Sequence, residues 1–290
     1  MKIKNLGLLF KRQAQKNPSE ICLDFGSNIK ITFKEADELS DKLATYLKSI
    51  RLKENDRLSI ESQKDLFSYI SILACLKTGV IYSFFDSNDG EDRINHILNT
   101  VKPKKIFLFS ENFQKNLRKK NTLLIDKNFK NKIKNIDLNK KPLIIKNNYF
   151  NAYIMFTSGS TGKPKGVLIN HYNLSFFINW VKKTFKIRKK IVMANLNPLH
   201  FDNSVFDLYG SLLNSATLVP VDKKDILIPN MLLQRLKLAK CDIWFSVPSL
   251  LDLILQLGGN FIFKNFNFKK MIFGGERFPL QSVKKIFNIC

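Results

Sequence analysis

The stretch from Tyr153 to Val167 reads YIMFTSGSTGKPKGV and decides the fold around it. Four apolar residues run into six that are all Gly, Ser or Thr, and Lys-Pro-Lys-Gly then leads into a second apolar run. The two apolar runs are typical of buried strands, and the small polar residues between them predict a loop. Such a loop can turn several backbone N–H groups toward one anion, so the stretch predicts a polyphosphate cradle.

The expected donors of this cradle are hydroxyls, a glycine-rich backbone and one ammonium group, from Thr157, Ser158, Gly159, Ser160, Thr161, Gly162 and Lys165. Lys165 supplies a point charge suited to phosphate and is the candidate catalytic residue. Thr157 is also the candidate contact for Mg²⁺. The stretch is not a Walker loop, because Pro164 follows Lys163 and disfavours a helix there. A flexible Gly/Ser hairpin is the alternative interpretation.

The order of Tyr, Thr-Ser-Gly-Ser-Thr-Gly and Pro-Lys-Gly-Val resembles the signature loop of the adenylate-forming (ANL) superfamily of AMP-dependent synthetases and ligases. The segment FDNSV, which begins at Phe201, is similar to a motif of amino-acid adenylation domains of nonribosomal peptide synthetases and of D-alanine–carrier protein ligases. TFKEA from Thr32 and LKTGVIY from Leu76 resemble two core motifs of the same superfamily. The resemblance implies ATP and Mg²⁺ as cofactors.

Strand and helix patterns alternate along the chain, which predicts an α/β fold with largely parallel strands. With the resemblance, this indicates two stacked α/β subdomains whose sheets are flanked by helices, as in the N-terminal part of an adenylate-forming enzyme. We expect the first subdomain to span 1–148 and the second, with the phosphate loop and part of the substrate pocket, to span 149–290. The Lys- and Asn-rich segment 110–148 is expected to be a solvated connector.

Asp202 precedes a helix that is expected to start near Ser204, where a carboxylate could simply cap the helix. The resemblance instead implies that Asp202 binds the α-ammonium group of an amino acid, and a carboxylate suits a cation in a partly desolvated pocket. His200 is expected to be a partly exposed filler. The resemblance also assigns the pocket edge and lining to Phe201, Asn203, Phe206, Phe245 and Ile272. Phe206 and Phe245 would leave little space in that pocket, which indicates a small amino acid.

Two glycines, Gly274 and Gly275, follow an expected strand and permit close approach of a ligand to the backbone. A tight turn capped by Glu276 is the alternative. The resemblance implies that this position borders both the acyl pocket and the adenine. His171 follows the second strand of the phosphate loop, and we expect it to cap or pack at least as readily as to catalyse.

The resemblance implies ATP-dependent activation of a carboxylic acid, here an amino acid, as an acyl-adenylate with release of pyrophosphate. The acyl group would then pass to a carrier-protein or CoA thiol. An acyl-CoA or fatty-acyl-AMP ligase fragment and a non-catalytic nucleotide-binding remnant remain as alternatives. Adenine, ribose and catalytic-lysine segments of the family are absent before residue 290, so we expect an incomplete enzyme that is truncated, degenerate, or split from a separately encoded C-terminal half.

The composition limits the partners of the chain. It holds 48 Lys and Arg against 24 Asp and Glu, a formal net charge of +24. The lysines are spread along the chain without a nucleic-acid-binding motif, so nucleic acid is not the expected partner, and part of the basic surface could instead dock an acidic protein. The resemblance implies that this protein is a carrier protein with phosphopantetheine. No membrane association is expected, because Lys77 and Gly79 interrupt the most apolar stretch. Four scattered cysteines without metal-ligand spacing are typical of a cytoplasmic protein.

Overall fold

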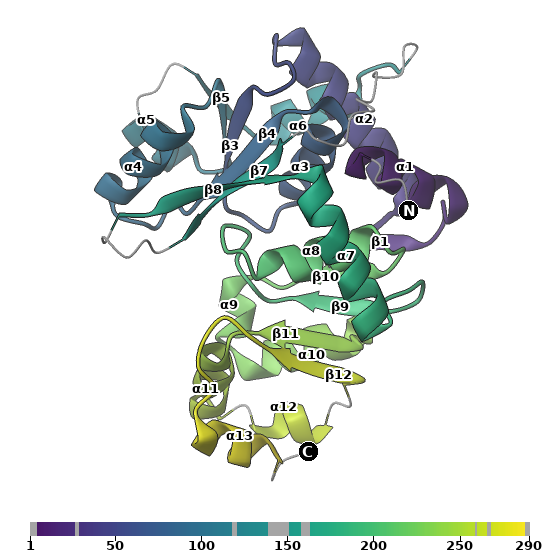
Figure 1. Ribbon diagram of the computed structural model, residues 1–290, viewed down its shortest axis with the longest axis vertical. Helices are drawn as coiled ribbons and strands as arrows, with labels where there is room; N and C mark the ends of the chain where they lie inside the picture. The colour runs from purple at the N-terminus through teal and green to yellow at the C-terminus, as the bar shows by residue number, and fades with distance from the viewer. Residues whose placement is uncertain are drawn as a thin grey trace. The chain divides into compact units, whose positions relative to one another are not determined.

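The computed structural model describes residues 5–26, 29–117, 121–138, 151–157, 163–258, 260–265 and 268–287. The chain folds into two compact units that each contain one six-stranded sheet (Figure 1). Unit 1 comprises Met1–Pro18, Lys34–Trp180 and Pro198–Phe201, and unit 2 comprises Ser19–Phe33, Val181–Asn197 and Asp202–Cys290. The predicted α/β class, with two largely parallel sheets flanked by helices, is confirmed.

The sheet of unit 1 has the strand order β6-β5-β3-β4-β7-β8. Its strands are β3 (Arg57–Glu61), β4 (Ile81–Phe85), β5 (Lys105–Leu108), β6 (Thr122–Leu124), β7 (Asn151–Thr157) and β8 (Lys165–Asn170). All neighbours pair in parallel except β7 and β8, which form an antiparallel hairpin. The helices of this part of the chain are α1 (Leu6–Lys16), α2 (Phe33–Ser49), α3 (Leu66–Thr78), α4 (Glu91–Val101), α5 (Glu111–Leu117), α6 (Lys127–Lys134) and α7 (His171–Phe185).

Helix α3 is the central helix of unit 1, and its residues from Phe67 to Thr78 are all buried. The helix is capped by Asp65, whose carboxylate accepts the N–H of Phe67 at 2.8 Å. It ends at Gly79, which has a φ of 72° and so adopts the left-handed conformation that glycine tolerates. Helix α1 packs closely on α3, since a Cβ atom on Gly7 would lie 2.8 Å from the backbone of Lys77.

The ammonium group of Lys77 is completely buried, and two carboxylates of α2 neutralise it. Its Nζ lies 2.7 Å from Oδ1 of Asp37 and 2.6 Å from Oδ1 of Asp41. Asp41 also pairs with Lys11 of α1 at 2.8 Å. A buried charge is tolerated only when it is paired and hydrogen-bonded, so this network fixes how α1, α2 and α3 pack.

The expectation of a solvated connector is wrong for residues 111–117 and 121–134, which contain α5, β6 and α6. Strand β6 extends the sheet beside β5, and Asp126 caps α6 by accepting the N–H of Phe129 at 2.7 Å. Phe129 and Ile133 are buried, and the ring of Phe129 contacts Tyr46 at a centroid distance of 5.2 Å. Two apolar residues four positions apart are enough to anchor this otherwise basic helix. The residues from 139 to 148 lie outside the described part of the chain.

The sheet of unit 2 has the order β12-β11-β9-β10-β1-β2, and only β1 and β2 pair antiparallel. Its strands are β1 (Ile21–Asp24), β2 (Lys30–Thr32), β9 (Val192–Asn195), β10 (Thr217–Pro220), β11 (Ile243–Ser246) and β12 (Lys270–Phe273). Its helices are α8 (Ser204–Leu212), α9 (Lys223–Ile226), α10 (Pro229–Ala239), α11 (Pro248–Gln256), α12 (Asn260–Asn265) and α13 (Leu280–Phe287). The core surrounds Trp244, whose ring contacts Phe263 and Phe268 at 5.6 and 5.5 Å.

The compact units divide the chain differently from the expected boundary at residue 148. Strand β1 pairs in parallel with β10, with Leu23 opposite Leu218, so an early segment joins the sheet of unit 2. Strand β7 pairs with β4, so the phosphate-loop hairpin belongs to unit 1. Hydrogen-bonded pairing between strands far apart in sequence, rather than chain order, sets the units.

In the described part of the chain, no helix is both long and apolar enough to span a membrane.

Replacing Lys77 by Met should lower the free energy of unfolding by about 3–5 kcal/mol, because the carboxylates of Asp37 and Asp41 lose their buried partner. Urea unfolding at neutral pH measures this change. Lys34→Met is the matched control, since Lys34 pairs with Glu38 at 3.9 Å on the exposed face of α2 and should contribute less than about 1 kcal/mol. Equal effects of the two substitutions would contradict the structural role of Lys77.

Candidate functional site

The β7–β8 hairpin carries the predicted phosphate-binding residues (Figure 1). Thr157 and Lys165 face each other as the last register pair of the hairpin, and both residues are exposed. The ammonium group of Lys165 makes no ion pair with any described residue. The remaining predicted donors, Ser158, Gly159, Ser160, Thr161 and Gly162, lie outside the described residues. The structure therefore brings one hydroxyl and one cation together at the place where the sequence predicts the cradle.

The hairpin is anchored through its apolar residues. Ile154 and Phe156 of β7 pack against the buried cluster that α4 and β5 form. On β8, a Cβ atom added to Gly166 would lie 3.0 Å from the Ile154 side chain and 3.3 Å from the Phe156 ring. Only a residue without a side chain lets the two strands approach so closely here. Gly166, which ends the Lys-Pro-Lys-Gly segment, thus serves the packing between β7 and β8.

His200 and Phe201 lie at the carboxyl edge of the unit 1 sheet. Nδ1 of His200 lies 3.0 Å from the hydroxyl of Ser62, which follows β3, and Nε2 lies 4.0 Å from the carboxylate of Asp86, which follows β4. The rings of His200 and Phe201 are in contact at 4.3 Å, and Phe201 remains 47% exposed. The side chain of His200 is thus partly exposed as expected, but it is held by polar contacts.

In unit 2, Asn203, Gly274 and Gly275 come together. The side-chain amide of Asn203 donates to the carbonyl of Gly274 at 3.4 Å. Gly275 has a φ of +95°, and a Cβ atom there would lie 2.6 Å from Nδ2 of Asn203. The double glycine therefore permits a close approach, but within unit 2 the approaching group is Asn203. Glu276 caps a helix as well, because its carboxylate accepts the N–H of Ser249 at the start of α11.

Three apolar residues of the predicted pocket are also neighbours. The rings of Phe206 and Phe245 are 4.7 Å apart, and Phe185 contacts Phe206 edge-on at 5.0 Å. Ile272 of β12 lies opposite Phe245 of β11 in the parallel register. Phe206 and Phe245 are nearly buried, whereas Ile272 is half-buried.

Asp202 is exposed just before α8. The N-cap residue of α8 is Asn203, and Asp202 contributes only its backbone carbonyl, which accepts the N–H of Val205. No hydrogen bond or ion pair engages the carboxylate of Asp202 among the described residues. The helix-cap interpretation of Asp202 is therefore not supported, and its carboxylate is available to a ligand.

A buried polar network behind these residues was missed by the sequence analysis. Oδ2 of Asp207 accepts hydrogen bonds from the amides of Asn195 and Asn197 at 3.1 and 3.2 Å. The Asn197 amide also donates to the carbonyl of Phe245 at 3.2 Å. The network joins α8 to the ends of β9 and β11 and so orients the Phe206–Phe245 pair. An aspartate in the apolar helix sequence VFDLYGSLL was the available signal.

His171 is a capping residue, one of the roles expected for it. Its side chain is buried, and Nδ1 accepts the N–H of Leu6, the first residue of α1, at 3.1 Å. The ring is therefore neutral with its proton on Nε2. Burial lowers the pKa of His171 to about 4, because the charged form would lose its hydration. His171 stabilises the N-terminus of α1 and carries no exposed reactive atom.

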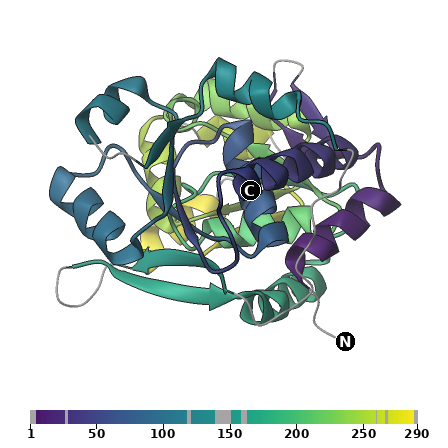
Figure 2. The same cartoon turned by 90° about the horizontal axis from the view of Figure 1, so that it is seen from above.

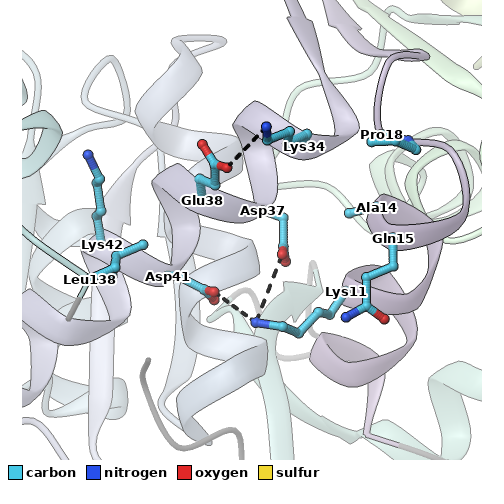
Figure 3. A pocket seen from close by; sticks show the side chains of 10 residues that line it. All are labelled: Lys11, Ala14, Gln15, Pro18, Lys34, Asp37, Glu38, Asp41, Lys42 and Leu138. Atoms are coloured by element: carbon cyan, nitrogen blue, oxygen red, sulfur yellow. Dashed lines mark hydrogen bonds and ion pairs between the residues drawn. The ribbon is translucent and has the colours of Figure 1, made fainter. Parts of the chain in front are cut away.

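A cavity of about 450 Å³ lies between α1 and α2 of unit 1, away from the predicted site residues (Figure 3). Lys11, Lys34, Asp37, Glu38 and Asp41 are among its lining residues. These charges pair with one another: Lys11 lies 2.8 Å from Asp41, and Lys34 lies 3.9 Å from Glu38. Lys42, which also lines the cavity, donates to the carbonyl oxygen of Lys134, so these charged groups already have partners within the protein.

The donor set of the hairpin fits a polyphosphate that brings its own metal ion. No group of three or more His, Cys, Asp or Glu side chains in the described residues is arranged to hold a metal. Mg²⁺ in nucleotide sites is held largely by phosphate oxygens and water, with few protein ligands. Thr157 can supply one such oxygen, and Lys165 can contact phosphate directly.

Comparison with known proteins agrees with these features. Residues 10–290 match the family described as AMP-binding enzyme. The chain belongs to the AMP-binding enzyme family. The predicted membership of the adenylate-forming superfamily is therefore confirmed, and so is the predicted kinship with carrier-protein ligases and nonribosomal peptide synthetases.

The chain is 31% identical over 279 residues to the D-alanine--D-alanyl carrier protein ligase of Listeria welshimeri, which covers 94% of this chain and 54% of the ligase. It is 30% identical over 290 residues to bacitracin synthase 1 of Bacillus licheniformis, covering 99% of this chain and 5% of the synthase. This AMP-binding chain therefore spans about half of the ligase. Its fold is similar to the inhibitor-bound N-terminal domain of FACL13 from Mycobacterium tuberculosis, with a TM-score of 0.87 at 17% identity over 98% of this chain and 73% of that one.

The stability of the AMP-binding chain should fall as the pH drops from about 6.5 toward 4. The folded-state pKa of His171 lies below its ordinary value of 6.5, so the unfolded chain takes up the proton first and is favoured in that window. Between about pH 7.5 and pH 5, His171 should account for a loss of about 2 kcal/mol.

Urea unfolding at the two pH values measures this loss. His171→Asn is the control, because its Oδ1 can accept the Leu6 N–H without titrating. The difference between the two pH values should shrink in this variant. An unchanged difference would show that His171 is not the group responsible.

Proposed function

We propose that this chain supplies the phosphate-binding hairpin and the amino-acid pocket of an enzyme that activates an amino acid with ATP. The product is the aminoacyl-adenylate, pyrophosphate is released, and the acyl group then passes to a carrier-protein thiol. The observation that carries this proposal is the exposed carboxylate of Asp202, which has no partner among the described residues, at the entry to α8. The similarity to a D-alanine--D-alanyl carrier protein ligase and to bacitracin synthase 1 supports the same proposal.

The hairpin residues would bind the β- and γ-phosphates. Thr157 offers a hydroxyl and Lys165 an ammonium group across the same register pair, and neither group is engaged elsewhere in the described structure. Phosphoryl and adenylyl transfer depend chiefly on positioning and on neutralising charge, so no protein nucleophile is required. The substrate carboxylate attacks the α-phosphorus, and the bond to pyrophosphate breaks. Lys165 stabilises negative charge on the departing pyrophosphate.

The pocket residues would select the amino acid. Asp202 would pair with the α-ammonium group, and Phe206 and Phe245 would contact the side chain. Because these two rings are in contact at 4.7 Å and are almost buried, they leave little room between them. A small side chain such as that of alanine suits such a lining. The buried network around Asp207 keeps both rings in place.

Replacing Lys165 by Met should weaken binding of MgATP and pyrophosphate to this chain about tenfold or more, because a charge-assisted contact to phosphate is lost. Isothermal titration calorimetry measures the affinities. Lys163→Met is the matched control, since Lys163 is exposed two residues earlier but lies outside the paired strands. Equal losses in both variants would indicate a general charge effect rather than a phosphate contact at Lys165.

Replacing Asp202 by Ala should abolish selection for the α-ammonium group. Loss of a carboxylate that pairs with a desolvated cation costs about 2–5 kcal/mol in transition-state binding, so amino-acid-dependent pyrophosphate exchange should fall at least about 30-fold. The affinity for MgATP should stay unchanged. The exchange is measured with this chain joined to the C-terminal half of the Listeria ligase, because the chain spans about half the length of that relative.

Asp222→Ala is the control for this experiment, because Asp222 is also an exposed helix-entry aspartate that makes no side-chain cap contact. Equal exchange in Asp202→Ala and the parent protein would contradict the assignment of Asp202. Exchange that depends on fatty acids instead of amino acids would favour an acyl ligase.

A further inference from the structure

His96 of α4 contacts the hairpin at the residue that precedes Lys165. Its Nε2 atom lies 2.9 Å from the carbonyl oxygen of Pro164, although the two residues are 68 positions apart in the sequence. A carbonyl oxygen only accepts hydrogen bonds, so Nε2 is the donor. Both the neutral Nε2–H form and the protonated form of the ring can make this bond. His96 belongs to none of the motifs that define the family resemblance.

This hydrogen bond is made to the peptide group that joins Pro164 to Lys165. The carbonyl of Pro164 and the N–H of Lys165 belong to one planar group, so fixing the carbonyl also fixes the direction of the backbone at Lys165. The proline ring already restricts φ at position 164, and Pro164 is buried. Lys165 is the first residue of β8 and pairs with Thr157. The hydrogen bond therefore holds the backbone at the point where the candidate phosphate ligands face each other.

Helix α4 is a rigid base for this bond. Its residues Ile94, Ile97 and Leu98 are buried in one cluster, and Ile154 and Phe156 of β7 pack against that cluster. Figures 1 and 2 show α4 beside the hairpin, whose strands are coloured teal. The helix thus contacts β7 through apolar side chains and the entry to β8 through His96. The apolar contact with β7 and the hydrogen bond to Pro164, which precedes β8, together fix the hairpin against α4.

We infer that His96 is a positioning residue, which sets the affinity for the phosphate groups of the nucleotide by orienting the Pro164–Lys165 peptide unit. The inference rests on the proposed function of the hairpin and adds a residue outside the phosphate loop to it. His96 is not itself proposed to contact the nucleotide. Its effect passes through the backbone to Lys165 and Thr157.

Three substitutions separate the hydrogen bond from the packing of the ring. His96→Gln retains an N–H donor at about the reach of Nε2, whereas His96→Asn places its amide near the position of Nδ1 and falls short of Pro164. His96→Phe keeps a ring but has no donor. We expect the Phe and Asn variants to bind MgATP and pyrophosphate about tenfold more weakly and the Gln variant to bind within about twofold of the parent chain.

The measurements are calorimetric titration of the intact 290-residue chain with MgATP and with pyrophosphate, and the ¹⁵N–¹H amide signal of Lys165 without ligand. The amide signal reports the hydrogen bond to the adjoining carbonyl, so it should shift in the Phe and Asn variants and stay near its original position in the Gln variant. Thermal unfolding of each variant shows whether a loss of affinity merely follows a loss of stability.

Each outcome has one meaning. Rescue by Gln of both the Lys165 signal and the affinity supports the inference. An affinity that is unchanged in His96→Phe overturns the positioning role, as does an equal loss in all three variants. If the parent chain binds neither MgATP nor pyrophosphate at millimolar concentration, the proposed function of the hairpin fails, whatever the Lys165 signal shows.

Discussion

A single buried ammonium group constrains the packing of unit 1. Lys77 has no access to water, so α2 must present Asp37 and Asp41 to it, and α1 must lie close enough for Lys11 to balance the second carboxylate. These contacts hold α3, which ends at Gly79 and leads directly into β4. Strand β4 in turn pairs with β7. The position of the phosphate-loop hairpin therefore depends, through α3 and β4, on the charge network around Lys77.

In each unit, the candidate functional residues follow the same topological rule. In open α/β sheets, ligands bind beyond the carboxyl ends of parallel strands. In unit 1, Thr157 ends β7, and His200 contacts the residues that follow β3 and β4. In unit 2, Phe245 lies near the end of β11, and Gly274 and Gly275 follow β12. Within each unit, residues from distant motifs thus lie at the same edge of the sheet, because each follows or ends a parallel strand.

The sequence predicted the local features well and the long-range pairings poorly. Alternating strand and helix patterns were enough for the fold class, and the start of α8 at Ser204 was predicted because helix-start signals act within one turn. Periodicity says nothing about partners, so the pairing of β1 with β10 was not foreseen. The His96–Pro164 contact and the network around Asp207 were missed for the same reason, since each joins residues from separate elements.

Two aspartates of one motif show how burial divides roles that the sequence leaves open. Asp202 and Asp207 lie five residues apart and carry the same group. Asp207 is buried and accepts two amide hydrogen bonds, so its charge serves to hold the pocket together. Asp202 is exposed, and its carboxylate makes no contact with the described residues. An exposed carboxylate is solvated in the free protein, and a cationic ligand is a partner that its chemistry suits. Asp207 thus holds α8 against the ends of β9 and β11, whereas Asp202 of the same motif is free of such a structural role and remains the proposed ligand-binding carboxylate.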